Sequence, residues 1–84
     1  MILEFDEHAF DDLRYWVSKD RKKTQKIMQL IEEIRRTPFT GTGKPEPLKY
    51  RLEKAWSRRI DHEHRLVYTV GDYHIRILAC RYHY

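Results

Sequence analysis

The 84 residues carry a net charge of +4, are 40% hydrophobic and 36% charged with mixed sign, and include a single cysteine, Cys80. Because hydrophobic residues occur throughout, this composition excludes a disordered chain, and the lone cysteine excludes an internal disulfide and fits a reducing compartment. The acidic N-terminus lacks the basic start and apolar run of a signal peptide, and no segment has the length of a membrane span. We therefore expect one soluble cytoplasmic domain over residues 1–84, with no membrane partner.

The N-terminal half predicts a strand and two helices. Residues 2–5 are typical of a short strand, and Asp6 suits the N-cap of a helix over about residues 7–19. In this helix apolar side chains recur at helical spacing: Phe10, Leu13, Trp16 and Val17. A second helix begins after Asp20 and ends at Thr37-Pro38. Its amphipathic stripe predicts a core-facing side: Ile27, Leu30, Ile31 and Ile34.

The C-terminal half predicts strands. Residues 38–47 contain two Gly and three Pro and form a loop, after which Leu48-Lys49 is a candidate strand start. Residues 56–60, 65–70 and 73–82 are typical of strands, and Gly71-Asp72 indicates a tight hairpin between the last two. The order predicts an α+β fold, in which an antiparallel β-sheet has both N-terminal helices packed on one face.

The charge is distributed unevenly along the chain. Residues 1–18 hold five acidic residues and one basic residue, whereas residues 19–84 hold sixteen basic and eight acidic ones, for a net charge of +8. Such an asymmetry indicates a surface for a polyanion, although a solubilising role would give the same composition. The second helix has a basic face opposite its apolar stripe, which is a solvated surface or, by hypothesis, a phosphate-facing one. This face comprises Arg21, Lys22, Lys23, Lys26, Arg35 and Arg36.

Several residues could supply metal-independent cleavage of RNA, which needs a base for the ribose 2′-hydroxyl, a cation for the phosphate and an acid for the leaving 5′-oxygen. Glu46 is the candidate base, because prolines on both sides restrict its backbone; the alternative is a surface Glu that balances nearby lysines. The candidate cations are Arg58, Arg59 and Arg65, and Lys44 is a further candidate for binding RNA. Any one of the three arginines, taken singly, is more simply explained as a surface charge on a strand. The chain ends in His83 and Tyr84, a candidate acid and a base-stacking ring.

The strand register tests whether these groups can meet. A two-residue turn at Gly71-Asp72 would set Arg65 and His83 on opposite faces of the sheet. We therefore expect a β-bulge, a three-residue turn or a chain that leaves the sheet after Arg81.

Two other features carry less weight. His62 and His64 could bind a metal only with further ligands. The chain offers one cysteine and no further ligands at a supporting spacing, so we expect no metal and no cofactor. Cys80 is expected to be a small core residue.

Four segments together resemble the RelE/YoeB family of bacterial toxins: RRTPFTGTGKPEPLK, WSRRI, EHRLVY and ACRYHY. The resemblance spans nearly the whole chain. It implies the fold of small microbial ribonucleases and cleavage of mRNA in the ribosomal A site of the small subunit, which stops translation. It also implies an antitoxin similar to YefM as partner, and a homodimer.

Carried over residue by residue, the resemblance gives each candidate a role. Glu46 is implied as the general base, Arg65 as the group that stabilises the phosphate, and His83 as the general acid. Tyr84 is implied to position the substrate, and Lys49 and Arg59 to bind its backbone. Two alternatives remain: a toxin of the same fold that inhibits gyrase, similar to ParE, and a basic RNA-binding module without catalysis.

Overall fold

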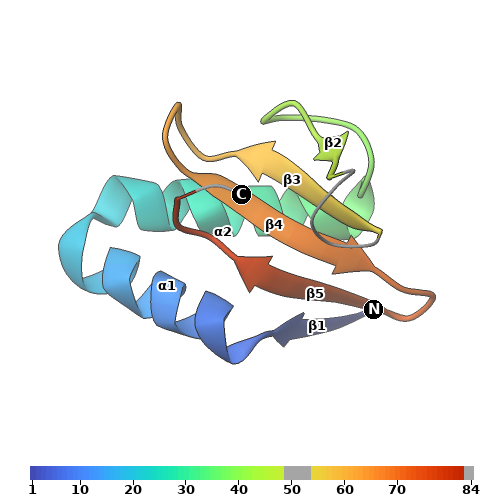
Figure 1. Cartoon of the computed structure of the whole chain (residues 1–84), viewed down its shortest axis with the longest axis horizontal. Helices are drawn as coiled ribbons and strands as arrows, with labels where there is room; N and C mark the ends of the chain where they lie inside the picture. Colours follow the sequence, from blue (N-terminus) through green and yellow to red (C-terminus); the bar gives the residue numbers. More distant parts are fainter. Residues whose placement is uncertain (49–53, 83–84) are drawn as a thin grey trace.

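The computed structural model describes residues 1–48 and 54–82 (Figure 1). The elements in chain order are β1 (Ile2–Phe5), α1 (Glu7–Lys19), α2 (Arg21–Arg36), β2 (Glu46–Pro47), β3 (Ala55–Arg59), β4 (Arg65–Val70) and β5 (His74–Ala79). Most bounds lie within one or two residues of the predicted ones. The strand expected to start at Leu48 begins instead at Glu46, and Lys49 lies outside the described residues. Within the described part of the chain, no helix is long and apolar enough to cross a membrane.

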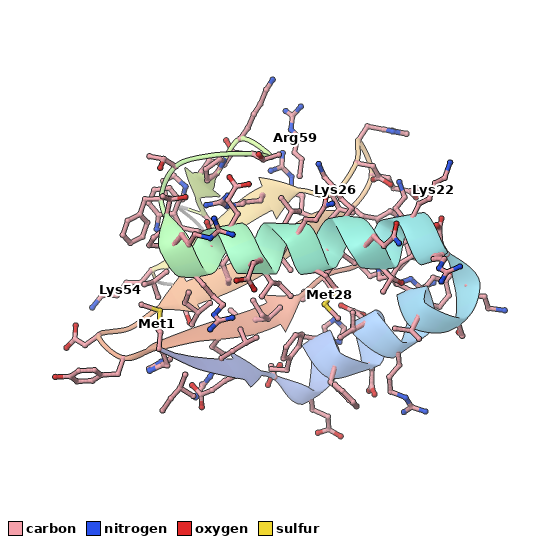
Figure 2. The ribbon with its side chains drawn as sticks, turned by 180° about the vertical axis from the view of Figure 1, so that it is seen from behind. Met1, Lys22, Lys26, Met28, Lys54 and Arg59 are labelled. Atoms are coloured by element: carbon pink, nitrogen blue, oxygen red, sulfur yellow. The ribbon has the colours of Figure 1, made fainter. Side chains whose placement is uncertain are left out.

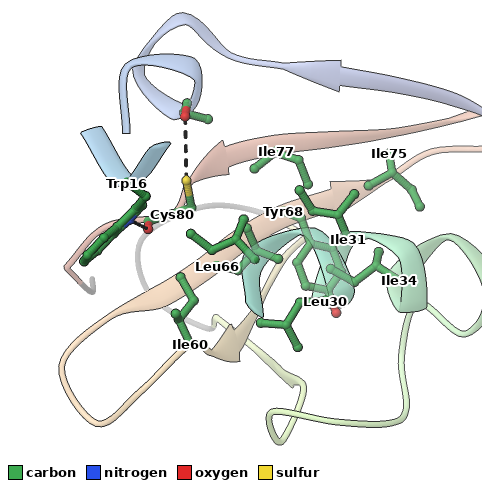
Figure 3. Packing of buried hydrophobic residues seen from close by; sticks show 12 residues of the cluster. Trp16, Leu30, Ile31, Ile34, Ile60, Leu66, Tyr68, Ile75, Ile77 and Cys80 are labelled. Carbon is green, nitrogen blue, oxygen red and sulfur yellow. Dashed lines mark hydrogen bonds between the residues drawn. The ribbon is translucent and has the colours of Figure 1, made fainter. Parts of the chain in front are cut away.

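Both helices pack on one face of the sheet, as predicted. The apolar stripe of α2 is buried, and Figure 3 shows Leu30, Ile31 and Ile34 facing Tyr68 of β4 and Ile77 of β5. Trp16 of α1 joins the same cluster. The second helix is capped as expected, because Asp20 Oδ1 accepts the backbone N–H of Lys23 at 3.1 Å. The main core is thus formed where this stripe and part of α1 pack against the sheet.

The sheet is mixed, which corrects the expectation of an antiparallel one. Its strand order is β1-β5-β4-β3-β2, and β1 runs parallel to β5 while the other pairs are antiparallel. The two helices carry the chain across one face from β1 to the far edge, where β2 begins (Figure 1). The meander then returns strand by strand and ends beside β1. A long connection of this kind permits a parallel pair that no local turn signal reveals.

The register between β4 and β5 contains a β-bulge, which is one of the three irregularities that we expected. Val67 lies opposite Ala79 but Tyr68 lies opposite Ile77, so Leu78 is an extra residue in β5. The hairpin turn was predicted one residue too early: Gly71 donates its N–H to the carbonyl of His74 at 2.8 Å, which leaves Asp72 and Tyr73 as the turn. The predicted last strand of residues 73–82 is correspondingly shorter.

Candidate active site

Glu46 and Arg65 meet on the sheet face that lies away from the helices. Glu46 of β2 is the register partner of Ser57 in β3, and Ser57 is the partner of Val67 in β4. Since alternate residues of a strand share a face, Arg65 lies on the same face as all three. Its Nη1 is 2.9 Å from Glu46 Oε1 and 3.1 Å from Ser57 Oγ. Two of the predicted catalytic side chains are thus in direct contact, although 19 residues separate them.

Arg59 adds a second guanidinium beside this pair. It is the register partner of Arg65, and directly opposite residues have Cβ atoms about 5 Å apart. Like charges so placed repel each other, so an anion that binds between them is favoured. Arg59 is exposed, and Figure 2 shows its side chain extending away from the sheet. Lys44, two residues before Glu46, is also exposed.

Arg58 lies on the opposite face and is fully buried, unlike the surface position expected for a residue that binds RNA. All five of its N–H groups are used within the protein. Nε donates to the hydroxyl of Tyr68, Nη1 to Glu33 Oε1 and to the carbonyl of Thr42, and Nη2 to the carbonyls of Thr37 and Thr40. Because alternation turns Arg58 toward the helices, its role is to hold the loop after α2, and it has no N–H left for a phosphate.

The loop held by Arg58 leads directly to Glu46. Glu33, the carboxylate partner of Arg58, has a pKa below its usual value. The chief cause is the hydrogen bond from the backbone N–H of Thr42, and Arg58 adds to the effect. Tyr68 has a raised pKa because it is buried, an effect that Arg58 partly opposes.

Gly43 has φ +87°, and a Cβ there would lie 3.0 Å from the carbonyl oxygen of Arg59. Glycine at this position lets the loop approach β3 closely enough for the Gly43 carbonyl to accept the N–H of Arg59 at 2.7 Å.

Ser57 is a site residue that the sequence reading missed. It is fully buried, and its hydroxyl oxygen accepts a hydrogen bond from Arg65. The signal was present in the alternation of WSRRI, which places Ser57 on the same face as Arg59 and opposite to Trp56 and Arg58.

The residues that follow β5 return to Arg65. The carbonyl of Tyr82 accepts a hydrogen bond from the backbone N–H of Arg65 at 2.8 Å. The backbone N–H of Tyr82 donates to Nδ1 of His64 at 2.7 Å. His64 is therefore a buried side chain with a partner rather than a free ligand, and within residues 1–48 and 54–82 no cluster of three residues could hold a metal ion. The other predicted site residues, Lys49, His83 and Tyr84, lie outside the described residues.

The buried thiol of Cys80 confirms the core position predicted for it. Burial, and to a lesser degree the charge of Asp12, raises the pKa of Cys80 to about 12. The thiol donates to the carbonyl of Ala9 at 3.7 Å, a contact drawn in Figure 3.

The fold places the chain among bacterial toxins. The YoeB/ParE toxin from Agrobacterium tumefaciens is similar with a TM-score of 0.96 and 43% identity, with full coverage of both chains. YoeB from Staphylococcus aureus, known as a dimer and in a heterotetrameric complex with YefM, is 48% identical with TM-scores of 0.93 and 0.90, and the matches cover 100% of this chain and 98% of that one.

The sequence comparisons give the family. The family model described as "YoeB-like toxin of bacterial type II toxin-antitoxin system" matches residues 5–84. Toxin YoeB of Escherichia coli K12 is 55% identical over 84 residues, which cover both chains completely. The chain therefore belongs to the YoeB-like toxins of bacterial type II toxin–antitoxin systems, which confirms the family resemblance found in the sequence.

Proposed function

We propose that this toxin is a metal-independent endoribonuclease that cuts mRNA in the ribosomal A site and so inhibits translation. The observation that carries the proposal is the contact between Glu46 and Arg65, with Arg59 beside it on a face that the helices leave open. A carboxylate and two guanidinium groups at one place match what 2′-hydroxyl attack on a phosphodiester requires. The family membership supports the same conclusion.

In this mechanism Glu46 removes the proton from the 2′-hydroxyl, and the 2′-oxygen attacks the adjacent phosphorus. Arg65 stabilises the negative charge that develops on the phosphoryl oxygens, a task that suits its planar fork of donors. His83 gives a proton to the departing 5′-oxygen as the P–O bond breaks. The products are a 2′,3′-cyclic phosphate and a 5′-hydroxyl. Tyr84 orients the nucleotide, and Lys49, Arg59 and Lys44 bind the RNA backbone.

The distribution of charge supports binding to a large polyanion. Figure 2 shows Lys22 and Lys26 of α2 extending toward the same side of the molecule as Arg59 of β3. Four basic residues of this helix are exposed, and Lys26 is partly buried; the four are Arg21, Lys22, Arg35 and Arg36. Such a surface gains affinity by releasing counterions from a nucleic acid, whether the nucleic acid is mRNA or ribosomal RNA.

The proposal is tested in a purified translation system in which mRNA ends are mapped by primer extension. The wild-type protein should produce cuts within the A-site codon, and Glu46→Ala and His83→Ala should each abolish them while the variants remain folded. DNA supercoiling by gyrase should be unaffected by the wild-type protein. Inhibition of gyrase without mRNA cleavage would favour the ParE-like alternative, and translation arrest that survives both substitutions would favour a non-catalytic RNA-binding module.

We also propose an antitoxin similar to YefM as partner and a homodimer as the assembled form. The solved complex and dimer of the Staphylococcus aureus relative support both. The outer side of α1 suits a protein contact, because Phe10 and Val17 are 53% and 63% exposed and line a shallow groove with Leu13. Co-expression with a small acidic protein encoded beside the toxin should restore growth, and size-exclusion chromatography with light scattering should report the stoichiometry.

A further inference from the structure

Glu46, the proposed general base, lies on a very short strand at the edge of the sheet. β2 contains only Glu46 and Pro47, and it pairs with β3 on one side alone. Pro45 and Pro47 have no N–H, so neither can donate a hydrogen bond to a neighbouring strand. On the C-terminal side, the N–H of Leu48 donates to the carbonyl of Ala55 at 2.8 Å. On the N-terminal side, the place of Glu46 depends on the loop that leads to it.

This loop is tied to α2 by a single carboxylate oxygen. Glu33 Oε1 accepts hydrogen bonds from the backbone N–H of Thr42 and from Arg58 Nη1. Figure 1 shows the loop running from the end of α2 to β2 at the far edge of the sheet. Because Arg58 is fully buried, its charge requires a carboxylate partner close by, and this requirement fixes the side chain of Glu33. One oxygen therefore joins α2, the loop and β3.

The backbone of the loop is shaped to admit the Glu33 carboxylate. Gly41 has φ +118°, a conformation that L side chains rarely adopt. A Cβ at this position would overlap Glu33 Oε1. Glycine at position 41 therefore lets the loop close over the carboxylate, and any side chain there would displace the carboxylate from Thr42 and Arg58.

The anchored part of the loop is directly connected to the candidate active site. The carbonyl of Gly43 accepts the N–H of Arg59 at 2.7 Å, and two residues separate Gly43 from Glu46. Since consecutive Cα atoms are about 3.8 Å apart, the link is at most about 11 Å long, and Pro45 restricts it further. A shift of the anchored loop is therefore passed on to Glu46, whose carboxylate has to meet Arg65.

We propose that Glu33 is a positioning residue for the general base Glu46. It acts through the loop rather than on the reacting atoms, because it fixes the point from which the chain enters β2. A misplacement of a catalytic group by about 1 Å can slow a reaction about a hundredfold, so a contact on the helix side of the sheet can control the rate. The inference rests on the proposed role of Glu46 and adds a residue that the cleavage chemistry itself does not use.

The test compares variants of Glu33 in single-turnover cleavage of ribosome-bound mRNA. Glu33→Leu removes the acceptor, whereas Glu33→Gln keeps an amide oxygen for Thr42 and Arg58. We expect Glu33→Leu to lower the maximal cleavage rate by about tenfold or more, with the half-saturating concentration changed by about twofold or less. Glu33→Gln should stay within about threefold of the wild type. The matched control is Glu32→Leu, which removes the same charge from an exposed position of the same helix and should cleave normally.

A double-variant cycle separates positioning from a general loss of structure. In the Glu46→Gln background, Glu33→Leu should change the cleavage rate by about twofold or less, because the group that Glu33 positions is no longer a base. Equal losses in the wild-type and Glu46→Gln backgrounds would overturn the inference, since a protein that is merely destabilised loses activity whether or not the base is present.

A second measurement does not depend on catalysis. Hydrogen exchange of the Thr42 and Arg59 amides, followed by NMR, should become about tenfold faster in Glu33→Leu, while exchange of the Arg65 amide stays unchanged. If Glu33→Leu does not fold, Gly41→Ala takes its place, because the added Cβ displaces the same carboxylate without removing its charge. A normal cleavage rate or slow Thr42 exchange in the variant used would overturn the inference. Faster exchange at Arg65 as well would show general loosening and would equally count against it.

Failure of this inference can be told apart from failure of the proposed function. If Glu46→Gln cleaves like the wild type, the role of Glu46 is wrong and the positioning proposal falls with it. If Glu46→Gln is inactive but Glu33→Leu and Gly41→Ala both cleave normally, the proposed function stands and the role of Glu33 is overturned.

Discussion

Arg65 Nη1 lies 2.9 Å from Glu46 Oε1 and is bonded at the same time to the hydroxyl of the buried Ser57. An ion pair whose Glu side chain is 55% exposed adds little to stability, because water screens both charges. We therefore interpret the contact as preorganisation of the site rather than as a source of stability. Ser57 orients the guanidinium of Arg65, and the guanidinium in turn orients the carboxylate of Glu46. A phosphate that enters the site would share Arg65 with Glu46.

The first prediction separates the chemistry of Glu46 from its contact with Arg65. Glu46→Gln keeps an oxygen that Arg65 can donate to but cannot accept a proton as a carboxylate does. Cleavage should fall by about 10²–10⁴-fold, the usual contribution of a general base, while the melting temperature stays within about one degree. Single-turnover cleavage and thermal melting measure the two effects. The matched control is Glu7→Gln at an exposed position of α1, and equal activity of both variants would remove Glu46 from the mechanism.

The second prediction concerns Ser57, whose hydroxyl accepts a hydrogen bond from Arg65. Ser57→Ala should reduce the maximal cleavage rate by about three- to tenfold, since it removes one hydrogen bond from the charged guanidinium to a neutral hydroxyl oxygen. Arg65→Lys should have a larger effect, because an ammonium lacks the planar fork in which one nitrogen contacts Ser57 and Glu46 and the other nitrogens can contact a phosphate. The double variant should be no worse than Arg65→Lys alone. Additive losses in this cycle would mean that Ser57 acts independently of Arg65.

The third prediction contrasts two adjacent arginines. Arg58→Met removes the hydrogen bonds that the guanidinium donates to Glu33 and to three backbone carbonyls, and it should lower the free energy of unfolding by about 3 kcal/mol or more, as measured by urea denaturation. Arg59→Met, at an exposed position, should change stability by about 0.5 kcal/mol or less but weaken binding to RNA and flatten its salt dependence. The opposite pattern would show that the two roles are exchanged.

The same pair shows what the sequence could and could not reveal. Charge and residue type favoured a shared role for Arg58 and Arg59, yet the period of a strand puts them on opposite faces, and Trp56 already indicated which face is the core. The helices were predictable because the stripe of α2 and the cap at Asp20 are local signals. The parallel pairing of β1 with β5 depends on contacts between distant segments, which local patterns do not encode.

The last prediction concerns the turn between β3 and β4, which precedes His64 and Arg65. Burial opposes ionisation of Asp61, but a hydrogen bond from Lys23 and the backbone N–H groups of His64 and Glu63 outweigh it and lower the pKa of Asp61 to about 2. A depressed carboxyl pKa stabilises the folded state fully above the unfolded value of 3.8, and this contribution is lost as the pH falls from 3.8 through 2.

Asp61→Asn should therefore lower the free energy of unfolding by about 1–2 kcal/mol at pH 7, and the difference from the wild type should shrink as the pH approaches 2. Urea denaturation across this range measures it, with Asp11→Asn at an exposed position of α1 as the control. Because Lys23 Nζ lies 2.6 Å from Asp61 Oδ2, Lys23→Met should reproduce part of the loss in the free energy of unfolding. A wild-type advantage that persists unchanged at pH 2 would show that the carboxylate charge of Asp61 does not hold this turn.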